Sequence, residues 1–483
     1  MARVSLVYFD IHTGFCPSFH HGLASLIGML RSERHDVRLH HVRSAEELER
    51  LTGRIAQDEP NILGLSFTTN QKKYAARFLD CGEALPCVKI AGGVHPTIVG
   101  EQLLGEWTHL DGVCLGEAES SLKELCRRID RREPYLDVPG FCFRQNGQIV
   151  RNPPPALPAV ETLPLPDYSL FDYENIVRDA SETFPMMLAR GCPYDCSYCC
   201  NHVLKGVYGT SENYVRIPPV SHALRLIRNN LALYPKTRKL VFCDDTFTIN
   251  RIWLKEFSER YAKEIGLPFF CNARVETITH ETVRYLKEAG CLSIDFGVES
   301  GSEWLRTNVL NRRHSNKRIE QAFLAVQKQG LHTFSFNLVG LPFETREMME
   351  ETLALNQRLR PNFGKVFFFY PYPGSRLYQI CEENSLLREG YDQVSGYLEA
   401  PALEETLVSH AEIRRQMERL QLFFYFRLGS AKAHLSAFAE RLCFRLVSPL
   451  RKPALAILDP ESRSPQIRWI RRQMRKVALR FFR

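Results

Sequence analysis

The sequence predicts an α/β protein with a doubly wound, Rossmann-like N-terminal domain, a partial TIM-like barrel of six β/α units, and an α-helical C-terminal region. Apolar runs of strand length alternate with amphipathic stretches of helix length in two separate blocks. Such alternation produces parallel sheets joined by right-handed crossovers. After residue 386 the alternation stops and long helical patterns take over. We therefore expect a first domain at 1–140, a linker at 141–182, the barrel at 183–385 and a C-terminal region at 386–483.

The first block has the spacing of a flavodoxin-like sheet, in which ligands bind beyond the carboxyl ends of the strands. Strands are expected at 4–9, 37–41, 62–67, 88–91 and 112–115, with a helix at 22–31. Polar residues and glycines follow these strands, which makes the strand ends candidate binding positions. The candidates taken from these ends are His12, Ser66, Thr68, Gly92, Gly93, His95, Gly116 and Glu117.

The second block contains six strand–helix units, too few for a closed eight-stranded barrel. Strands are expected at 186–190, 239–243, 269–273, 292–298, 333–339 and 365–369, and helices at 220–233, 252–265, 281–289, 317–329 and 345–359. An open, partial barrel fits this count, and chemistry in such folds sits at the carboxyl ends of the strands. The polar residues and the glycine at these ends are Asp244, Asp245, Arg274, Glu299, Ser300, Asn337 and Gly340. Singly, each could also be a helix cap, a turn or a salt-bridged barrel residue.

Three cysteines, Cys192, Cys196 and Cys199, follow the first barrel strand with the spacing C-x3-C-x2-C, and Tyr198 precedes the third. Three thiolates on one loop suit an iron–sulfur cluster with one iron left open. A zinc site using His202 is an alternative, although zinc modules usually pair two short Cys/His motifs. The fifteen cysteines are scattered and no secretory leader is evident, so disulfides are not expected. We expect a cytoplasmic protein.

On these residues the middle of the chain resembles the radical S-adenosylmethionine (SAM) superfamily. The run Gly297-Val298-Glu299-Ser300-Gly301 matches the G-x-E-S-G signature of that family. The resemblance implies a [4Fe-4S] cluster held by Cys192, Cys196 and Cys199. It further implies SAM contacts from Tyr198, Asp244, Asp245, Arg274, Glu299, Ser300, Asn337 and Gly340. The cluster would transfer one electron to SAM, giving methionine and a 5′-deoxyadenosyl radical, and a flavodoxin- or ferredoxin-type donor would supply that electron.

The N-terminal block resembles the domain that precedes the core in cobalamin-binding radical SAM enzymes. The matching features are the runs 92–97 and 116–119 and the proline-rich linker 152–167. The resemblance implies that cobalamin binds at the candidate strand ends of the first sheet. One departure concerns the motif D-x-H-x-x-G, because Asp10 and His12 fit but Gly14 comes one place too early. His12 is therefore a weak candidate for a cobalt ligand.

The net charge of +8 belongs to the C-terminal tail, because residues 444–483 carry a net +9 and the rest of the chain sums to about −1. An apolar stripe runs through this basic segment at helical spacing, over Ile467, Ile470, Met474, Val477 and Phe481. Such a helix could pack on its own domain, lie on an anionic membrane surface, or dock on a partner. A membrane-facing tail would favour a lipid-like substrate. Nucleic acid is the least favoured partner.

The favoured function is a cobalamin-dependent methyl transfer to an unactivated carbon of a small-molecule or lipid-like substrate in a biosynthetic pathway. A radical cyclisation, dehydration or rearrangement without methyl transfer is the alternative. Methylthiotransferases share this layout, but no β-rich RNA-binding module follows the core. An iron–sulfur electron carrier or a zinc-binding module would leave the G-x-E-S-G run unexplained.

Overall fold

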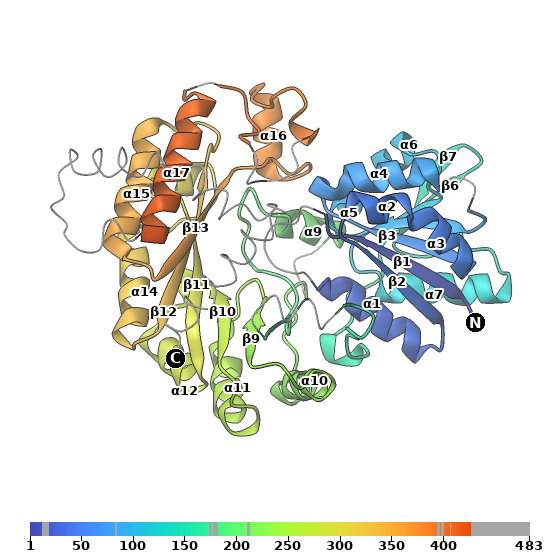
Figure 1. Cartoon of the computed structure of the whole chain (residues 1–483), viewed down its shortest axis with the longest axis horizontal. Coiled ribbons are helices and arrows are strands. Elements are labelled where there is room, and N and C mark those ends of the chain that lie inside the picture. Colours follow the sequence, from blue (N-terminus) through green and yellow to red (C-terminus); the bar gives the residue numbers. More distant parts are fainter. Residues whose placement is uncertain are drawn as a thin grey trace.

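The computed structural model describes residues 1–11, 19–82, 85–172, 176, 182–209, 213–393, 397, 400–405 and 407–426. Two sheets, each flanked by helices, lie side by side, with the N-terminal sheet on the right of Figure 1 and the second sheet on the left. The helix α9 (Asn201–Val207) lies between them. The predicted two-block α/β architecture is therefore confirmed.

The first sheet has the strand order β2-β1-β3-β4-β5-β6-β7, and its first five strands are parallel. The strands are β1 Arg3–Phe9, β2 Asp36–Val42, β3 Ile62–Ser66, β4 Val88–Gly92, β5 Gly112–Cys114, β6 Phe141–Gln145 and β7 Gln148–Arg151. Its helices are α1 His21–Ser32, α2 Ala45–Glu49, α3 Leu51–Asp58, α4 Lys72–Cys81, α5 Val94–Val99, α6 Glu101–Glu106 and α7 Glu119–Arg131. The order 2-1-3-4-5 confirms the flavodoxin-like prediction. Alternate residues of β1 join different apolar cores, because Leu6 packs on one face of the sheet and Val7 on the other.

The first domain extends further than predicted, because residues 141–151 form an antiparallel hairpin on its edge. These residues fall in the predicted linker 141–182. Asn146 and Gly147 connect the two strands with positive φ angles of 50° and 78°, the conformation of a tight two-residue hairpin turn. An Asn-Gly pair between two short apolar runs is the signal that could have revealed this hairpin.

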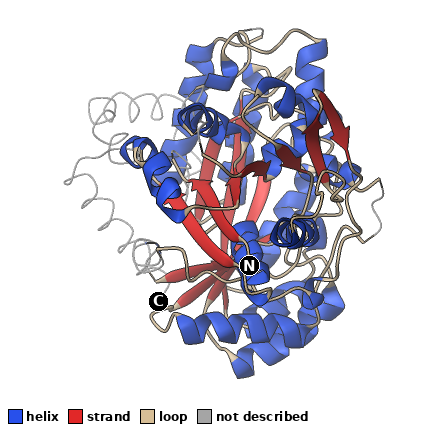
Figure 2. Ribbon diagram, turned by 90° about the vertical axis from the view of Figure 1, so that its right-hand side faces the viewer, coloured by secondary structure: helices blue, strands red, loops and turns tan. Residues whose placement is uncertain are grey.

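The second sheet has six parallel strands in the order β13-β12-β11-β10-β9-β8, with β8 and β13 as open edges. The strands are β8 Thr183–Met186, β9 Lys239–Phe242, β10 Phe269–Ala273, β11 Cys291–Glu299, β12 His332–Val339 and β13 Phe363–Phe368. The helices are α10 Val220–Leu233, α11 Arg251–Glu264, α12 His280–Glu288, α13 Glu303–Asn308, α14 Asn316–Lys328, α15 Arg346–Leu359, α16 Arg376–Glu383 and α17 His410–Phe426. Figure 2 shows the strands of this sheet with helices around them. The open six-stranded barrel is confirmed.

The strand β8 ends four residues earlier than predicted. Beyond Met186, the backbone N–H groups of Leu188 and Ala189 donate to the Asp244 carboxylate at 3.2 and 2.6 Å instead of continuing the ladder. Arg190 then forms a single antiparallel bridge with Arg216. The Asp244 side chain thus replaces the neighbouring strand as hydrogen-bond partner of this segment, and the backbone continues from there into the cysteine loop.

The described part of the C-terminal region packs on the barrel. Helix α17 lies against the edge strand β13 and helix α15, with Ile413, Met417 and Leu420 in a shared apolar cluster. The predicted basic helix falls within residues 427–483, which lie outside the described residues. Within the described ranges, no helix combines the length and apolar character that crossing a membrane requires.

Candidate active site

The three candidate cluster cysteines lie on one loop between β8 and α9. Lys205 of α9 holds this loop by donating to the carbonyls of Pro193 and Tyr194 at 3.3 Å and by pairing with Asp195. Gly191 opens the loop with φ +84°, and a Cβ there would lie 2.4 Å from the carbonyl oxygen of Tyr214. Only glycine fits this position, because the conformation and the close approach both exclude a side chain.

Two arginines that lie far apart in the sequence converge on Cys196. Its thiol is buried, and Nη1 of Arg274 approaches the sulfur at 3.0 Å and Nη1 of Arg312 at 3.9 Å. The Arg274 guanidinium also stacks on Tyr194, 3.7 Å from the ring centre, and pairs with Glu276 at 2.5 Å. Positive charge next to a thiol favours the thiolate, which is the form that ligates metals.

The other two cysteines have different surroundings. A hydrogen bond from the Cys200 thiol is the main reason that the pKa of Cys199 falls to about 7, and Asn201 also donates to its sulfur, at 3.6 Å. Burial raises the pKa of Cys192, whose sulfur lies 3.9 Å from the Thr246 hydroxyl. In the described residues, no three His, Cys, Asp or Glu side chains gather where they could hold a single metal ion. In an iron–sulfur cluster the thiolates bind the irons of an extended group.

The acidic pair after β9 is divided between two roles. Both carboxylate oxygens of Asp244 accept the backbone N–H groups that lead into the cysteine loop, and burial raises its pKa to about 7. Asp245 instead accepts a hydrogen bond from Asn201, next to Cys199, at 3.2 Å. Asp244 therefore holds the loop, and Asp245 is the member of the pair that remains for a ligand.

The side chains of Tyr198 and Glu299, which lie 101 positions apart in the sequence, contact each other. The Tyr198 hydroxyl donates to Glu299 at 2.8 Å, and Arg312 contacts both, at 3.2 Å from the tyrosine oxygen and 3.6 Å from the carboxylate. Arg312 also donates to the carbonyl of Gly297 at 2.6 Å. Glu299 has φ +63° and follows a shift in strand register, so the backbone is bent where its side chain turns to Tyr198. Arg312 was not predicted from the sequence.

Ser300 and Asn337 are not placed as predicted. The Ser300 hydroxyl lies 3.4 Å from the Thr352 hydroxyl on α15. The Asn337 amide bonds to Ser335 and accepts from Asn356 of α15 at 2.8 Å. Both side chains are fully buried on the helix-covered face of the sheet. Their strand-end positions predict contacts with SAM, but the alternation of side chains along β12 turns Asn337 away from the barrel interior.

The G-x-E-S-G run ends at a glycine that packs directly on α15. A Cβ on Gly301 would lie 2.3 Å from the carbonyl oxygen of Glu351 and 2.5 Å from Cα of Thr352, both backbone atoms.

We expect Gly301→Ala to lower the free energy of unfolding by about 3 kcal/mol, because the strand end or the helix must move. Gly53→Ala in α3, where nothing lies within 4 Å, should leave stability unchanged or raise it slightly. Urea denaturation compares the two variants, and equal stabilities would contradict the close approach.

The loop after β12 contains a buried carboxylate. Gly340 has φ +74°, and its N–H and that of Leu341 donate to Oε2 of Glu344 at 2.7 and 3.1 Å. Oε1 of Glu344 has no partner among the described residues. Burial raises the pKa of Glu344 from 4.5 to about 8. The folded protein therefore holds a proton here that the unfolded chain releases near pH 4.5.

This proton makes stability depend on pH. Because the folded state binds the proton between pH 4.5 and 8 and the unfolded state does not, Glu344 should lower stability as the pH rises through this range. We expect Glu344→Gln to remove that decline and to raise the free energy of unfolding at pH 9 by about 2 kcal/mol relative to wild type. Urea denaturation at pH 5, 7 and 9 measures the free energy of unfolding. Glu350→Gln, at an exposed carboxylate, is the control. A difference from wild type that is constant with pH would contradict the assignment.

The carboxyl edge of the first sheet offers hydroxyls and a glycine cradle. Ser66 lies 3.0 Å from Nε2 of His20, and Nδ1 of that ring accepts the Leu23 N–H, so Nε2 donates. Burial lowers the pKa of His20 to about 4 and keeps this ring neutral. Gly93 has φ +95°, and a Cβ there would stand 3.1 Å from the Ser66 hydroxyl. Gly92 ends β4 directly before it, with only the Cys114 side chain within 4 Å of its Cβ position.

Two further candidates lie at this edge, and one falls outside the described part. Thr68 is exposed, and its N–H donates to the side-chain oxygen of Gln71 at 2.8 Å. His95 is buried against Thr69, with Nδ1 3.0 Å from that hydroxyl, and its Nε2 has no partner among the described residues. Burial lowers the pKa of His95 to about 4. His12 lies in residues 12–18, outside the described residues. These hydroxyls, glycines and neutral histidines suit a cofactor whose bound edge is polar and carries no charge.

Gly116 and Glu117 have another role than predicted, because they contact the second domain. Glu117 forms ion pairs with Arg190, at 2.5 Å, and with Arg216. Arg190 also pairs with Glu119 at 2.7 Å. A Cβ on Gly116 would collide with the Tyr208 hydroxyl. Since Arg190 lies two residues before Cys192, this network ties the first domain to the start of the cysteine loop.

Comparisons with known proteins agree with this arrangement. The Radical SAM superfamily profile matches residues 186–355, and the B12 binding domain profile matches residues 18–126. The chain is 27% identical to an uncharacterized methyltransferase, PH0819, of Pyrococcus horikoshii, over 76% of this chain and 79% of that one. It is 24% identical to the anaerobic magnesium-protoporphyrin IX monomethyl ester cyclase of Cereibacter sphaeroides, over 82% of this chain and 68% of that one.

A solved structure shares the fold. The radical S-adenosylmethionine methyltransferase TsrM of Kitasatospora setae, solved with tryptophan substrate and a SAM analog, aligns with a TM-score of 0.64 at 16% identity. The alignment covers 80% of this chain and 77% of that chain. The chain therefore contains a radical SAM domain and, ahead of it, a B12-binding domain, which is the domain order of cobalamin-binding radical SAM enzymes.

Proposed function

We propose that the chain is a cobalamin-dependent radical SAM methyltransferase that acts on an unactivated carbon of a small molecule. The observation that carries this proposal is the junction between the two domains. The carboxyl edge of the first sheet faces the cysteine loop of the second domain, to which Glu117 and Arg190 tie it. Two cofactors bound at these two edges would therefore lie next to one another. We place the domains at 1–151 and 183–385, and we retain 386–483 as the C-terminal region.

The residues present fit the three groups that this function needs. Cys192, Cys196 and Cys199 would hold a [4Fe-4S] cluster. Tyr198, Asp245, Arg274, Glu299 and Gly340 would contact SAM, and Ser66, Thr68, Gly92, Gly93 and His95 would contact cobalamin. When bound, the cluster supplies the electron that cleaves SAM and cobalamin relays a methyl group.

The chain's own side chains orient and bury this site. Asp244 fixes the backbone before the cysteine loop, and Arg312 fixes Tyr198 against Glu299. The guanidiniums of Arg274 and Arg312 place positive charge beside the buried Cys196 sulfur, where it would compensate the negative charge of a bound cluster. A flavodoxin- or ferredoxin-type protein would supply electrons.

A second candidate function is a radical cyclisation without methyl transfer. The similarity to a protein named as a cyclase favours it. The two reactions differ in what remains of SAM, because methyl transfer leaves S-adenosylhomocysteine and radical formation leaves 5′-deoxyadenosine. Both reactions need the same cluster, so iron content does not separate them.

Product analysis tests the proposal. Anaerobically purified protein with reconstituted cluster, cobalamin, SAM and a flavodoxin reducing system should form both S-adenosylhomocysteine and 5′-deoxyadenosine. 5′-Deoxyadenosine without S-adenosylhomocysteine would favour the cyclase reaction. A colourless protein that holds one zinc and cleaves no SAM would contradict both, and it would favour the zinc-binding alternative.

A further inference from the structure

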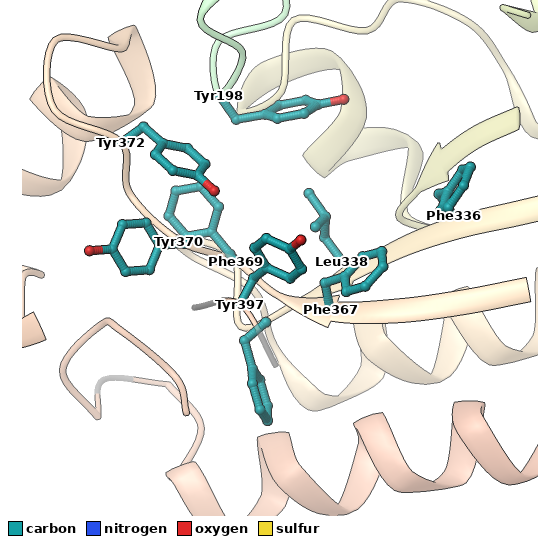
Figure 3. A pocket seen from close by; sticks show the side chains of 9 residues that line it. Tyr198, Phe336, Leu338, Phe367, Phe369, Tyr370, Tyr372 and Tyr397 are labelled. Carbon is teal, nitrogen blue, oxygen red and sulfur yellow. The ribbon is translucent and has the colours of Figure 1, made fainter. Parts of the chain in front are cut away.

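A pocket made almost entirely of aromatic side chains lies beside the cysteine loop. Its volume is about 290 Å³. Figure 3 shows the ring of Tyr198 over one side of it and the rings of Tyr372 and Tyr397 projecting into it from other segments. The lining residues are Tyr198, Phe336, Leu338, Phe367, Phe368, Phe369, Tyr370, Tyr372 and Tyr397. All but Leu338 are aromatic, and none carries a formal charge at neutral pH.

The pocket adjoins the proposed SAM contacts without coinciding with them. Phe336 and Phe367 lie on β12 and β13, at one lateral edge of the sheet. Asp245 follows β9, which lies near the other lateral edge. Of the proposed SAM contacts, only Tyr198 lines the pocket. The Tyr198 hydroxyl bonds to Glu299, another proposed SAM contact, and the Tyr198 ring lines the pocket. Tyr198 therefore lies between the proposed SAM contacts and the pocket and touches both. A molecule in the pocket would lie next to SAM.

The first domain also reaches the pocket. The side chain of Asn70, which follows Thr68 at the carboxyl edge of the first sheet, hydrogen-bonds the hydroxyl of Tyr372. Tyr372 is thus both a wall of the pocket and a contact with the proposed cobalamin face. A methyl acceptor must approach both cofactors. The pocket borders Tyr198, a proposed SAM contact, and Tyr372, which contacts the proposed cobalamin face.

We propose that this pocket binds the substrate through an uncharged, planar conjugated ring. The proposal rests on the function proposed above. Aromatic side chains stack on flat rings and gain dispersion energy from them, whereas a charged group would lose its hydration here without a partner. Ligand pockets commonly span about 300–1,000 Å³, so this one takes a small ring system, or one ring of a larger molecule whose remainder extends outward.

A matched pair of ring compounds tests the pocket. 2-Naphthol and trans-2-decalol have the same carbon skeleton and no charge, and only the first is planar. By anaerobic calorimetry on the full chain with its cluster reconstituted, we expect 2-naphthol to bind about fivefold more tightly than the decalol. We expect Phe367→Leu to weaken 2-naphthol binding by about threefold or more. Phe363→Leu, on the same strand and face but outside the pocket, should not change it.

Equal binding of the two compounds, no binding of either, or equal effects of the two substitutions would overturn the proposal. Displacement of 2-naphthol by saturating SAM would also overturn it, because the pocket would then take the adenine ring. Competition by protoporphyrin IX separates the two sources of a planar ring: displacement indicates a large macrocycle, and no displacement indicates a small ring compound. These measurements need no turnover, so failure of the proposed methyl transfer would appear separately, in the product analysis.

Discussion

Cys196→Ser should remove the bound iron and reduce SAM cleavage by at least about a thousandfold. Cys196 is the buried cysteine of the loop, and two guanidiniums direct positive charge at its sulfur. A serine hydroxyl has a far higher pKa than a thiol and is a poor ligand for cluster iron, so the remaining two thiolates would hold a cluster weakly. Iron analysis and the visible absorption of anaerobically purified protein measure the effect. The wild-type chain should hold about four iron atoms.

The neighbouring cysteine provides the control. Cys200 is not a predicted ligand, and its thiol donates a hydrogen bond to Cys199. A serine at position 200 keeps a donor there, so Cys200→Ser should retain the iron and most of the activity. Loss of iron in Cys200→Ser together with retention in Cys196→Ser would show that the ligand set is wrong. One zinc per chain in both variants and in the wild type would favour a zinc module.

The fold was predictable because strands and helices alternate strongly in the sequence. The helix α10 spans the predicted 220–233, and each other predicted barrel helix lies within one residue of its expected bounds. Two boundaries differ from the prediction. The strand β8 ends early because Asp244, 56 residues beyond Leu188 in the sequence, accepts the backbone N–H groups of Leu188 and Ala189. The hairpin β6–β7 falls in the predicted linker because its strands, of five and four residues, are too short to show a clear alternation.

The site was less predictable because strand-end position does not fix side-chain direction. Asn337 and Leu338 are adjacent on β12, yet only Leu338 lines the pocket, while Asn337 bonds to α15. Counting the two-residue period of the strand from Phe336 would have separated them. Arg312 belongs to no motif, and its contact with Tyr198 joins residues 114 positions apart. Such a contact follows only from the packed fold.

Glu117→Ala should destabilise the protein by about 2–3 kcal/mol, because it removes the carboxylate that pairs with both Arg190 and Arg216 across the domain junction. Arg216 is buried, with a side chain 8% exposed, and its guanidinium would lose its ion-pair partner at the interface. Arg190 would keep Glu119. Thermal and urea denaturation measure the loss, and faster proteolysis within the linker 152–167 should accompany it. Glu117→Ala combined with Arg216→Met should recover part of the stability, since no unpaired charge would remain.

Glu124→Ala is the matched control, because Glu124 also pairs with two arginines, Arg127 and Arg128, but their side chains are 37% and 18% exposed, against 8% for Arg216. Ion pairs in water contribute about 0–1 kcal/mol, so this variant should change stability little. An equal loss in both variants would contradict a special role for the interface.

If the interface has that role, the effect of Glu117→Ala should reach the second domain, because Arg190 stands two residues before Cys192 and is bridged to Arg216. Iron retention should then fall in Glu117→Ala and stay unchanged in Glu124→Ala, although neither residue contacts a cysteine of the loop.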